Sequence, residues 1–409
     1  MRAILGLVAV VFMGAGTPRT PARYLVIPTG HSTDAGVAPC PPSLSADGAS
    51  VAFDTPASLE PADQNGRPDV YLLDRTTNRV TLVSRNLAGG TGRGASRCPR
   101  VSGDGQRIVF ESDVTDLVEG DLPGTNDVFV FDRGTAALRR IVATTGAAPL
   151  TAARPALSTD GRTIVFDARP VDATPDQRSH VYRASLATAN DVEDLGEGYG
   201  ATVSGDGRIV AFVTSPNSGV PRVIRVVGPG LSRNVSPSSG QTGAEDVFAP
   251  ALSSDGQWIS YVSRPGTTRT GATDAVRSQV FVERIGDGQR HLVSVTPNGR
   301  EANGVSKLPT IDATGSRVVF ESTATNLGCD TDGLPSCNSD INLLGDIFEW
   351  ERATGTVTRV NTATRDLAWL EGAAYPTLSP DGKHVAFLSR QPVSVTDGRD
   401  TFDLFITQQ

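Results

Sequence analysis

The stretch Arg100–Arg133 reads RVSGDGQRIVFESDVTDLVEGDLPGTNDVFVFDR, and it contains the unit from which the chain is built. A serine and an Asp-Gly pair, beginning at Ser102, precede the apolar run Ile108–Phe110. Gly adopts positive φ at no steric cost, and Asp and Ser side chains bond the turn's own backbone, so the segment predicts a tight turn between two strands. A polar loop, a second apolar run at Val128–Phe131 and a weaker one at Arg140–Val142 follow. The stretch therefore predicts one antiparallel sheet of four short strands.

This unit occurs seven times. The turn recurs at intervals of 46 to 67 residues, measured between the aspartates of the Asp-Gly pairs, and an apolar strand follows every turn. One copy lacks the Asp-Gly pair, and there the interval is measured to Thr314. The copies are Asp47-Gly48, Asp104-Gly105, Asp160-Gly161, Asp206-Gly207, Asp255-Gly256 and Asp381-Gly382, with the degenerate copy at Asp312–Gly315. Repetition of a four-stranded unit of this length predicts a β-propeller. The expected fold is all-β: a single seven-bladed propeller of four-stranded antiparallel blades.

The two ends of the chain predict how the ring closes. Leu25 lies 22 residues before Asp47, as Leu82 lies 22 residues before Asp104, so Tyr24–Ile27 is expected to be an outer strand without a blade of its own. The seventh unit ends with its third strand, Phe402–Ile406, and lacks a fourth. An open ring would leave edge backbone groups unpaired. We therefore expect the N-terminal strand to pair with the last blade.

Two segments resemble a known repeat. LSPDGKHVAFLS at Leu378–Ser389 and NDVFVFDR at Asn126–Arg133 resemble the TolB-type, WD-repeat-like propeller repeat. The resemblance covers essentially everything after residue 22 and implies the propeller fold. It implies no single function, since members of this group include periplasmic scaffolds, propeller domains of peptidases and many secreted proteins. The sixth unit departs from the turn pattern, and the fourth lacks the aspartate before its third strand.

Residues 1–22 predict a secretory signal peptide, and residues 23–409 predict the propeller. Arg2 is followed by the apolar run Ala3–Ala15, which is too short to span a bilayer comfortably, and then by glycines and prolines. The alternative, a buried first strand, agrees less well with those breakers. The expected location is secreted or periplasmic, with no membrane span in the mature chain. The 43 Gly and 27 Pro favour short strands and turns over long helices.

The two faces of the ring differ in their connections. The Asp-Gly turns are expected on one face, here called the turn face. The loops between second and third strands, and those between blades, are expected on the other, here called the loop face. Six connections of the loop face are long: Pro56–Pro68, Val114–Asn126, Arg169–Ser179, Arg264–Arg277, Ala324–Gly345 and Gln391–Thr401. Long loops are where proteins concentrate function, so the loop face is the predicted ligand-binding face.

A polar residue opens the third strand of most blades. These residues are Asp69, Asp127, His180, Gln279, Asp346 and Asp403. One interpretation is that each caps its loop by accepting backbone hydrogen bonds. The other is a polar rim that binds a ligand. Trp369, for stacking on a sugar or a partner, and His31, for acid–base chemistry beside His180, complete the predicted ligand-binding set.

Two loops are candidate calcium sites. Asp63, Asn65 and Asp69 place oxygens around a glycine, as a hard cation requires, and Asp330 and Asp332 form a similar group. Solvated turn residues are the alternative, since the full twelve-residue loop with its terminal Glu is missing. Calcium is thus the one candidate cofactor.

Four cysteines predict two disulfides in an exported protein. Cys329 and Cys337 lie in one loop, and Cys40 and Cys98 stand before the first strands of consecutive units. The second pair would clamp neighbouring blades. A zinc site is the rival interpretation, but no CxxC pair or nearby histidine completes four ligands.

Charge and motifs restrict the function. A net charge of −8 disfavours nucleic acid, and there is no GxSxG nucleophile motif. The expected protein is an exported, monomeric binding or scaffold module that presents its loop face to a protein or glycan, with no assigned catalytic residue. The alternative is a carbohydrate-active enzyme, a lyase or hydrolase, that uses carboxylates near the axis of the ring.

Overall fold

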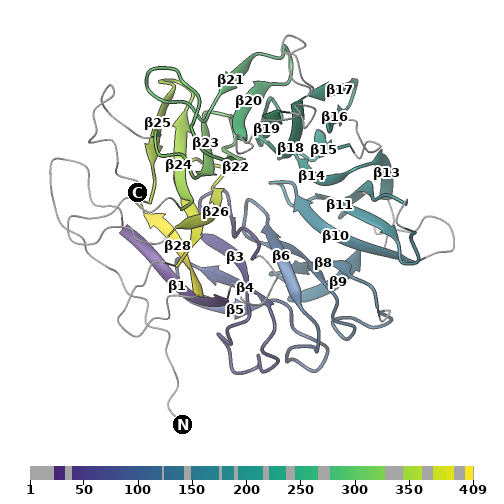
Figure 1. The fold of residues 1–409 in the computed structure, drawn as a ribbon. Helices are drawn as coiled ribbons and strands as arrows, with labels where there is room; N and C mark the ends of the chain where they lie inside the picture. The colour runs from purple at the N-terminus through teal and green to yellow at the C-terminus, as the bar shows by residue number, and fades with distance from the viewer. Residues whose placement is uncertain are drawn as a thin grey trace.

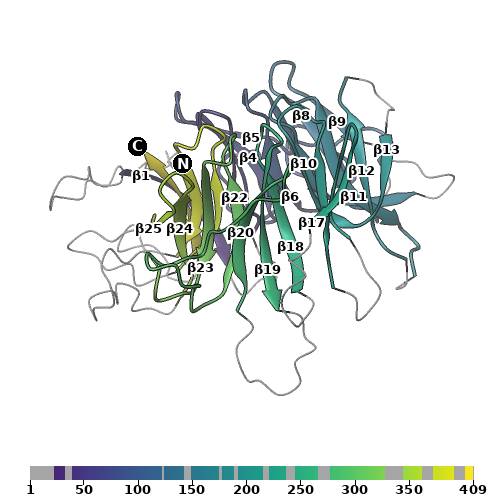
Figure 2. The ribbon, with the colours of Figure 1, turned by 90° about the horizontal axis from the view of Figure 1, so that it is seen from above.

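The chain folds into a ring of seven sheets (Figure 1). The computed structural model describes residues 23–32, 39–121, 124–141, 149–174, 177–187, 192–214, 221–235, 245–265, 277–327, 344–361, 372–390 and 401–408. These residues contain 28 strands and no helix, and therefore no helix that would be long and apolar enough to cross a membrane. Each sheet has four antiparallel strands, and the sheets stand beside one another around a common axis (Figures 1 and 2). The predicted seven-bladed propeller is confirmed.

Each blade runs from an inner strand near the axis to an outer strand at the rim. The first four blades are β2 (Ser43–Leu44), β3 (Ser50–Thr55), β4 (Asp69–Asp74) and β5 (Arg79–Leu82); β6 (Ser96–Val101), β7 (Arg107–Ser112), β8 (Asp127–Asp132) and β9 (Ala137–Ile141); β10 (Leu150–Leu157), β11 (Thr163–Pro170), β12 (His180–Ser185) and β13 (Val192–Glu197); and β14 (Tyr199–Val203), β15 (Val210–Val213), β16 (Ile224–Gly228) and β17 (Leu231–Val235). Blades five and six are β18 (Glu245–Leu252), β19 (Trp258–Pro265), β20 (Gln279–Arg284) and β21 (Arg290–Leu292); and β22 (Ser306–Ile311), β23 (Arg317–Ser322), β24 (Asp346–Glu351) and β25 (Thr356–Arg359). Blade seven is β26 (Ala373–Leu378), β27 (Val385–Ser389) and β28 (Thr401–Gln408), with β1 (Arg23–Ser32) as its outer strand.

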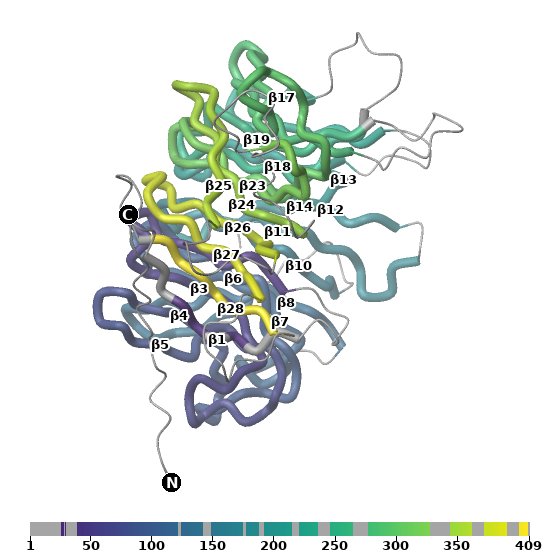
Figure 3. The backbone as a smooth tube through the Cα atoms, turned by 60° about the vertical axis from the view of Figure 1, so that its left-hand side comes forward, coloured from purple at the N-terminus to yellow at the C-terminus, as the bar shows by residue number. Residues whose placement is uncertain are grey.

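The pairing of β1 with β28 confirms the predicted closure. Leu25 pairs with Ile406, and Val26 pairs with Phe405, in an antiparallel register that is interrupted once between Pro28 and His31. Figure 3 shows the N-terminal strand beside the C-terminal strand. The side chains of Val26 and Ile27 are buried, so β1 contributes both a hydrogen-bonded edge and apolar area to blade seven.

The strands pack through aromatic pairs that recur from blade to blade. In blade two, Phe110 of the second strand stacks on Phe129 of the third, with ring centroids 5.7 Å apart. The other stacked pairs are Phe53–Tyr71, Phe166–Tyr182, Tyr261–Phe281, Phe320–Phe348 and Phe387–Phe405. Because both strand faces are covered by neighbouring blades, the apolar runs of the sequence do not alternate with polar residues.

The Asp-Gly turns are locked by the serine that precedes them. In blade two, Ser102 Oγ donates to Asp104 Oδ1 at 2.5 Å and accepts the Arg107 N–H at 2.9 Å. Blade six has Asp312 where the other blades have this serine, and its carboxylate accepts the N–H groups of Thr314 and Ser316 directly. The degenerate copy therefore forms the same turn with a different acceptor.

Backbone hydrogen bonds join the seven turns into a closed ring. They run from Ala46 N to Gly103 O, Gly103 N to Thr159 O, Asp160 N to Gly205 O, Gly205 N to Ser254 O, Asp255 N to Ala313 O, Ala313 N to Pro380 O and Asp381 N to Ala46 O. Small residues of different blades meet near the axis of the ring. Thr159 Oγ1 lies 3.0 Å from Ser254 Oγ, and a Cβ on Gly103 would lie 2.5 Å from Thr159 Cγ2. The described residues are thus tightly packed around the axis at the turn face.

Six inner strands contain a β-bulge. At these bulges Cys98, Arg154, Gly200, Ala249, Leu308 and Tyr375 have positive φ. A non-glycine residue in this conformation costs about 1–2 kcal/mol, so its neighbours must stabilise it. In three blades a carboxylate accepts the N–H of the next blade's bulge residue, which is a glycine in one case: Glu111 Oε2 from Arg154 (2.6 Å), Asp167 Oδ1 from Gly200 (3.0 Å) and Glu321 Oε2 from Tyr375 (3.4 Å).

Candidate functional site

The polar residues predicted to open the third strands occupy equivalent positions in their blades. In blade one this residue, Asp69, is buried and hydrogen-bonded. Asp69 accepts Ser84 Oγ at 2.7 Å and Asn65 Nδ2 at 2.8 Å. Ser84 Oγ in turn accepts the Val70 N–H at 3.1 Å, which ties the third strand to the end of the fourth. Burial raises the pKa of Asp69 to about 7, against the effect of the Ser84 and Asn65 hydrogen bonds.

Blades five and six repeat this arrangement with other side chains. Gln279 Oε1 accepts Ser294 Oγ at 2.5 Å, and Asn361 Nδ2 donates to Asp346 Oδ1 at 2.7 Å. The partners Ser294 and Asn361 accept the N–H groups of Val280 and Ile347. These contacts point within the blade, toward the fourth strand, and not toward the axis. The structure therefore gives these residues a strand-fixing role, while ligand binding by them stays a prediction.

The other members of the predicted ligand-binding set whose side chains the structure describes contact separate partners. Asp127 is buried and accepts Thr125 Oγ1 at 2.7 Å, and Asp403 is buried with the Thr29 N–H 3.4 Å from its Oδ1. His180 is half-exposed and lies 2.9 Å from Asp194 through Nδ1. The backbone of His31 pairs with Phe402 in blade seven. Trp369 lies outside the described residues.

The first predicted calcium loop is closed by its own hydrogen bonds. Asp63 Oδ2 accepts the Tyr71 hydroxyl at 2.6 Å, and Asn65 faces Asp69 with its amide nitrogen. Among the described residues, no group of three or more His, Cys, Asp or Glu side chains is arranged to hold a metal ion. Asp330 and Asp332 lie outside those residues. Calcium binding stays a prediction.

The predicted Cys40–Cys98 disulfide is present, with 5.0 Å between the Cα atoms. It joins the segment before β2 to the bulge of β6, and so clamps blade one to blade two as expected. Cys329 and Cys337 lie outside the described residues, and their pairing stays a prediction.

The side chains that do converge at the loop face are arginines and aromatic residues of blades three to five. We call Arg154, Asp167, Tyr199, Arg222, Asp246, Phe248 and Arg264 the loop-face cluster. Tyr199 begins β14, Arg222 precedes β16, and Asp246 and Arg264 lie at the paired loop-face ends of β18 and β19. Residues from three blades thus meet because their strands end at the same face.

Ion pairs and ring contacts hold this cluster together. Arg154 pairs with Asp167, and its guanidinium carbon lies 5.6 Å from the Tyr199 ring centroid. The Tyr199 hydroxyl accepts Arg222 Nη1 at 3.0 Å. Arg222 and Arg264 both pair with Asp246, and both lie over the Phe248 ring, with centroid distances of 5.7 and 5.2 Å.

The carboxylates of the cluster are more buried than its arginines. Asp167 is 2% exposed, and burial raises its pKa to about 6, against the effect of Arg154. The side chains of Arg154, Arg222 and Arg264 remain 54%, 36% and 33% exposed. The carboxylates therefore orient the guanidinium groups, whose side chains remain partly exposed.

A smaller group of the same kind lies in blades six and seven. Lys307 Nζ lies 3.0 Å from Glu321 Oε1, and the Glu321 carboxylate supports the bulge at Tyr375. Tyr375 contacts Phe402 edge to face, and the Arg390 guanidinium lies 4.9 Å from the Phe402 ring centroid. Arginine or lysine beside an aromatic ring is therefore a recurrent feature of the loop face.

None of the residues of the loop-face cluster belongs to the set predicted from the sequence. A signal was available, because Tyr199 and Phe248 occupy the same position, five residues before the serine of their turn, and Arg154 stands four residues before its own. An alignment of the seven units upstream of the turn would have placed these residues on the inner strands.

Comparison with known structures agrees with this fold. The chain is similar to an oligogalacturonate lyase from Vibrio parahaemolyticus, with 15% identity, a TM-score of 0.58 and coverage of 98% of both chains. It is also similar to an oligogalacturonate lyase in complex with manganese, with 17% identity, a TM-score of 0.57 and coverage of 95% and 93%. A third similar structure is the propeller domain of the Trilobed protease from Pyrococcus furiosus, with 12% identity, a TM-score of 0.55 and coverage of 90% and 95%. At these identities the likeness shows the fold alone.

No protein-family model matches the chain, and no curated protein matches it. The propeller part of the TolB-type resemblance is thus confirmed, and membership of that particular repeat family stays a prediction.

Proposed function

We propose that the protein is an extracytoplasmic binding module that takes a protein or glycan ligand at its loop face. The observation that carries the proposal is the loop-face cluster, in which three arginines and two aromatic rings are pre-oriented and partly exposed. Arginine and aromatic side chains dominate the energetics of binding surfaces, and they also pair with carboxylates and stack on sugar rings.

Two further features support this proposal. The Cys40–Cys98 disulfide and the leader-like residues 1–22 agree with an oxidising compartment. The packed ring of turn residues at the opposite face leaves the loop face as the side from which a ligand approaches the inner strands. We expect a ligand that carries carboxylates, because exposed guanidinium groups bind these in bidentate fashion.

A binding screen with matched variants tests the proposal. The mature protein is applied to a glycan array and used for pull-down, in parallel with Arg222→Ala/Arg264→Ala. The control is Arg284→Ala, because Arg284 is an arginine of similar exposure at the turn-face end of β20 that pairs with Asp287. Binding should be lost in the double variant and kept in the control. Equal binding by both variants would contradict the proposed site.

A second candidate is a carbohydrate lyase or hydrolase. It is favoured by Asp167, a buried carboxylate whose pKa burial raises to about 6 beside Arg154, because acid–base catalysis uses carboxylates tuned in this way. Two of the similar structures are oligogalacturonate lyases, which makes oligogalacturonate the first substrate to assay. Formation of unsaturated or reducing ends by the wild type and its loss in Asp167→Asn would support this candidate. Absence of product with oligogalacturonate and with neutral oligosaccharides would eliminate it.

A further inference from the structure

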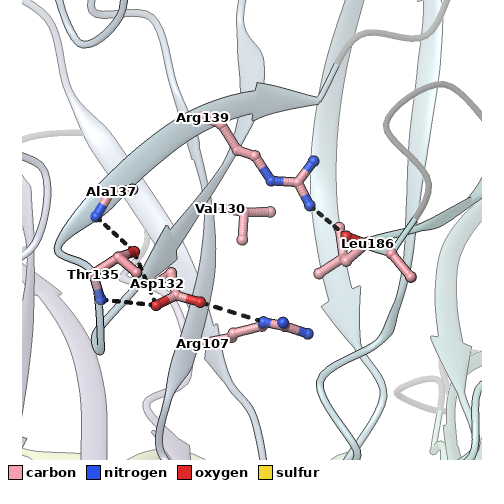
Figure 4. Close-up of a pocket in the computed structure, with 8 residues that line it drawn as sticks. Arg107, Val130, Asp132, Thr135, Ala137, Arg139 and Leu186 are labelled. Carbon is pink, nitrogen blue, oxygen red and sulfur yellow. Dashed lines mark hydrogen bonds and ion pairs between the residues drawn. The ribbon is translucent and has the colours of Figure 1, made fainter.

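A pocket of about 360 Å³ lies between blades two and three, away from the loop-face cluster. It is lined by Arg107, Val130, Asp132, Thr135, Arg139 and Leu186, among others. Figure 4 shows the two arginines extending toward blade three on either side of Val130. Arg107 belongs to β7, Arg139 to β9, and Leu186 follows β12, so the pocket is built by two blades.

The pocket contains two cationic side chains and one carboxylate. Arg139 donates through Nη2 to Leu186 O at 3.0 Å, and among the described residues its other N–H groups have no hydrogen-bond partner. Arg107 Nη1 donates to Gly161 O at 2.6 Å, and its Nε lies 3.8 Å from Asp132 Oδ2. Burial, and after it the positive charge of Arg107, lowers the pKa of Arg139.

Blades four and five contain the equivalent pocket, of about 380 Å³, with different charged side chains. Arg233 pairs with Val226 across the outer strands as Arg139 pairs with Val130, and it donates to Ile285 O as Arg139 donates to Leu186 O. In blade five, however, Arg233 also forms an ion pair with Glu283, a buried carboxylate two residues before Ile285.

The corresponding residue of blade three is Ala184, two residues before Leu186. Blade five therefore provides a carboxylate that neutralises Arg233, whereas blade three provides none for Arg139. At the position of Arg107, five residues after the serine of the turn, blade four has the apolar Ile209. The other arginine that lines the second pocket, Arg284, pairs with Asp287. Both arginines that line the second pocket therefore have a carboxylate partner, whereas Arg139 has none among the described residues.

We propose that Arg107 and Arg139 bind an oxyanion of the phosphate or sulfate type in the pocket between blades two and three. Two guanidinium groups that approach from different strands provide several N–H donors to a tetrahedral anion, in the manner usual for phosphate recognition by arginine. The Thr135 hydroxyl adds a polar group, and Val130 and Leu186 provide an apolar wall against which the carbon atoms of an ester can pack.

Isothermal titration calorimetry with inorganic phosphate, inorganic sulfate and phenyl phosphate tests the proposal, with chloride at matched ionic strength as the reference. The variants are Arg139→Gln, which removes one donor group, and Ala184→Glu, which places a carboxylate where blade five has Glu283. The matched control is Arg233→Gln in the second pocket. Thermal unfolding identifies any variant that fails to fold. If Ala184→Glu does not fold, then Arg139→Gln decides.

The wild type should bind one oxyanion per chain. The affinity should fall by about tenfold or more in Arg139→Gln and Ala184→Glu, because a charge-assisted contact is lost or neutralised, and it should be unchanged in Arg233→Gln. Tighter binding of phenyl phosphate than of inorganic phosphate would identify the ligand as an end group of a larger molecule, and equal binding would identify it as a free ion. Absence of binding by the wild type, or undiminished binding by folded Arg139→Gln, would overturn the proposal.

Discussion

The closure of the ring can be tested at Ile27, whose side chain is 7% exposed and packs with the core of blades seven and one. Its neighbours in that core include Leu404 and Ile406 of β28. Substitution by alanine removes three carbon atoms, each worth about 0.8 kcal/mol of transfer free energy, and leaves a cavity that adds to the loss. We therefore expect Ile27→Ala to lower the free energy of unfolding by roughly 2–4 kcal/mol.

Urea unfolding followed by circular dichroism measures this loss. The control is Leu87→Ala, which removes an equally large side chain that is 64% exposed and should change the stability by less than about 0.5 kcal/mol. Hydrogen exchange gives an independent measurement, because weakening of β1 should speed exchange in β28, to which it is paired. An Ile27→Ala stability equal to that of Leu87→Ala, with unchanged exchange in residues 401–408, would refute the closure argument.

Three further predictions concern the rest of the ring. Replacement of Cys98 by serine should destabilise the protein by about 4 kcal/mol in denaturant titrations, the loop-entropy value for a sequence separation of 58 residues. The wild type and the variant should be equally stable once both are reduced. Burial raises the folded-state pKa of Asp54 to about 7 from its ordinary 3.8, so between these pH values the folded chain binds more protons than the unfolded chain. The stability that Asp54 contributes is therefore complete below about pH 4, and up to roughly 4 kcal/mol of it is lost as the pH rises to 7. Asp54→Asn should flatten this part of the plot of unfolding free energy against pH. A wild-type slope in the variant would contradict the assignment to Asp54. Gly103→Ala should lower the free energy of unfolding by about 1–3 kcal/mol, because the new Cβ would lie 2.5 Å from Thr159 Cγ2. The control Gly286→Ala places its Cβ in open space and should be nearly neutral. Equal melting temperatures of the two variants would contradict the tight packing around the axis.

The role of the polar residues that open the third strands could not be predicted from the sequence. Asp69 and Asp346 were expected to cap a loop or to form a rim around a ligand, and the sequence offered no way to choose. Their partners, Ser84 and Asn361, lie two residues beyond the fourth strand, and only the pairing of the third and fourth strands brings them together. The three carboxylates that support bulges of the following blade find their partners only through the packing of one blade against the next.

The sequence alone determined the number of blades, the position of every turn and the strand that closes the ring. These features follow from local patterns, such as an Asp-Gly pair before an apolar run, which repeat along the chain. Only the tertiary structure brought Arg154, Tyr199, Arg222 and Arg264 into one cluster and left Arg139 without the carboxylate that its counterpart Arg233 has. Such differences arise between neighbouring blades, about one repeat apart in sequence, where side-chain contacts depend on how the strands pack and not on the pattern that each blade shares.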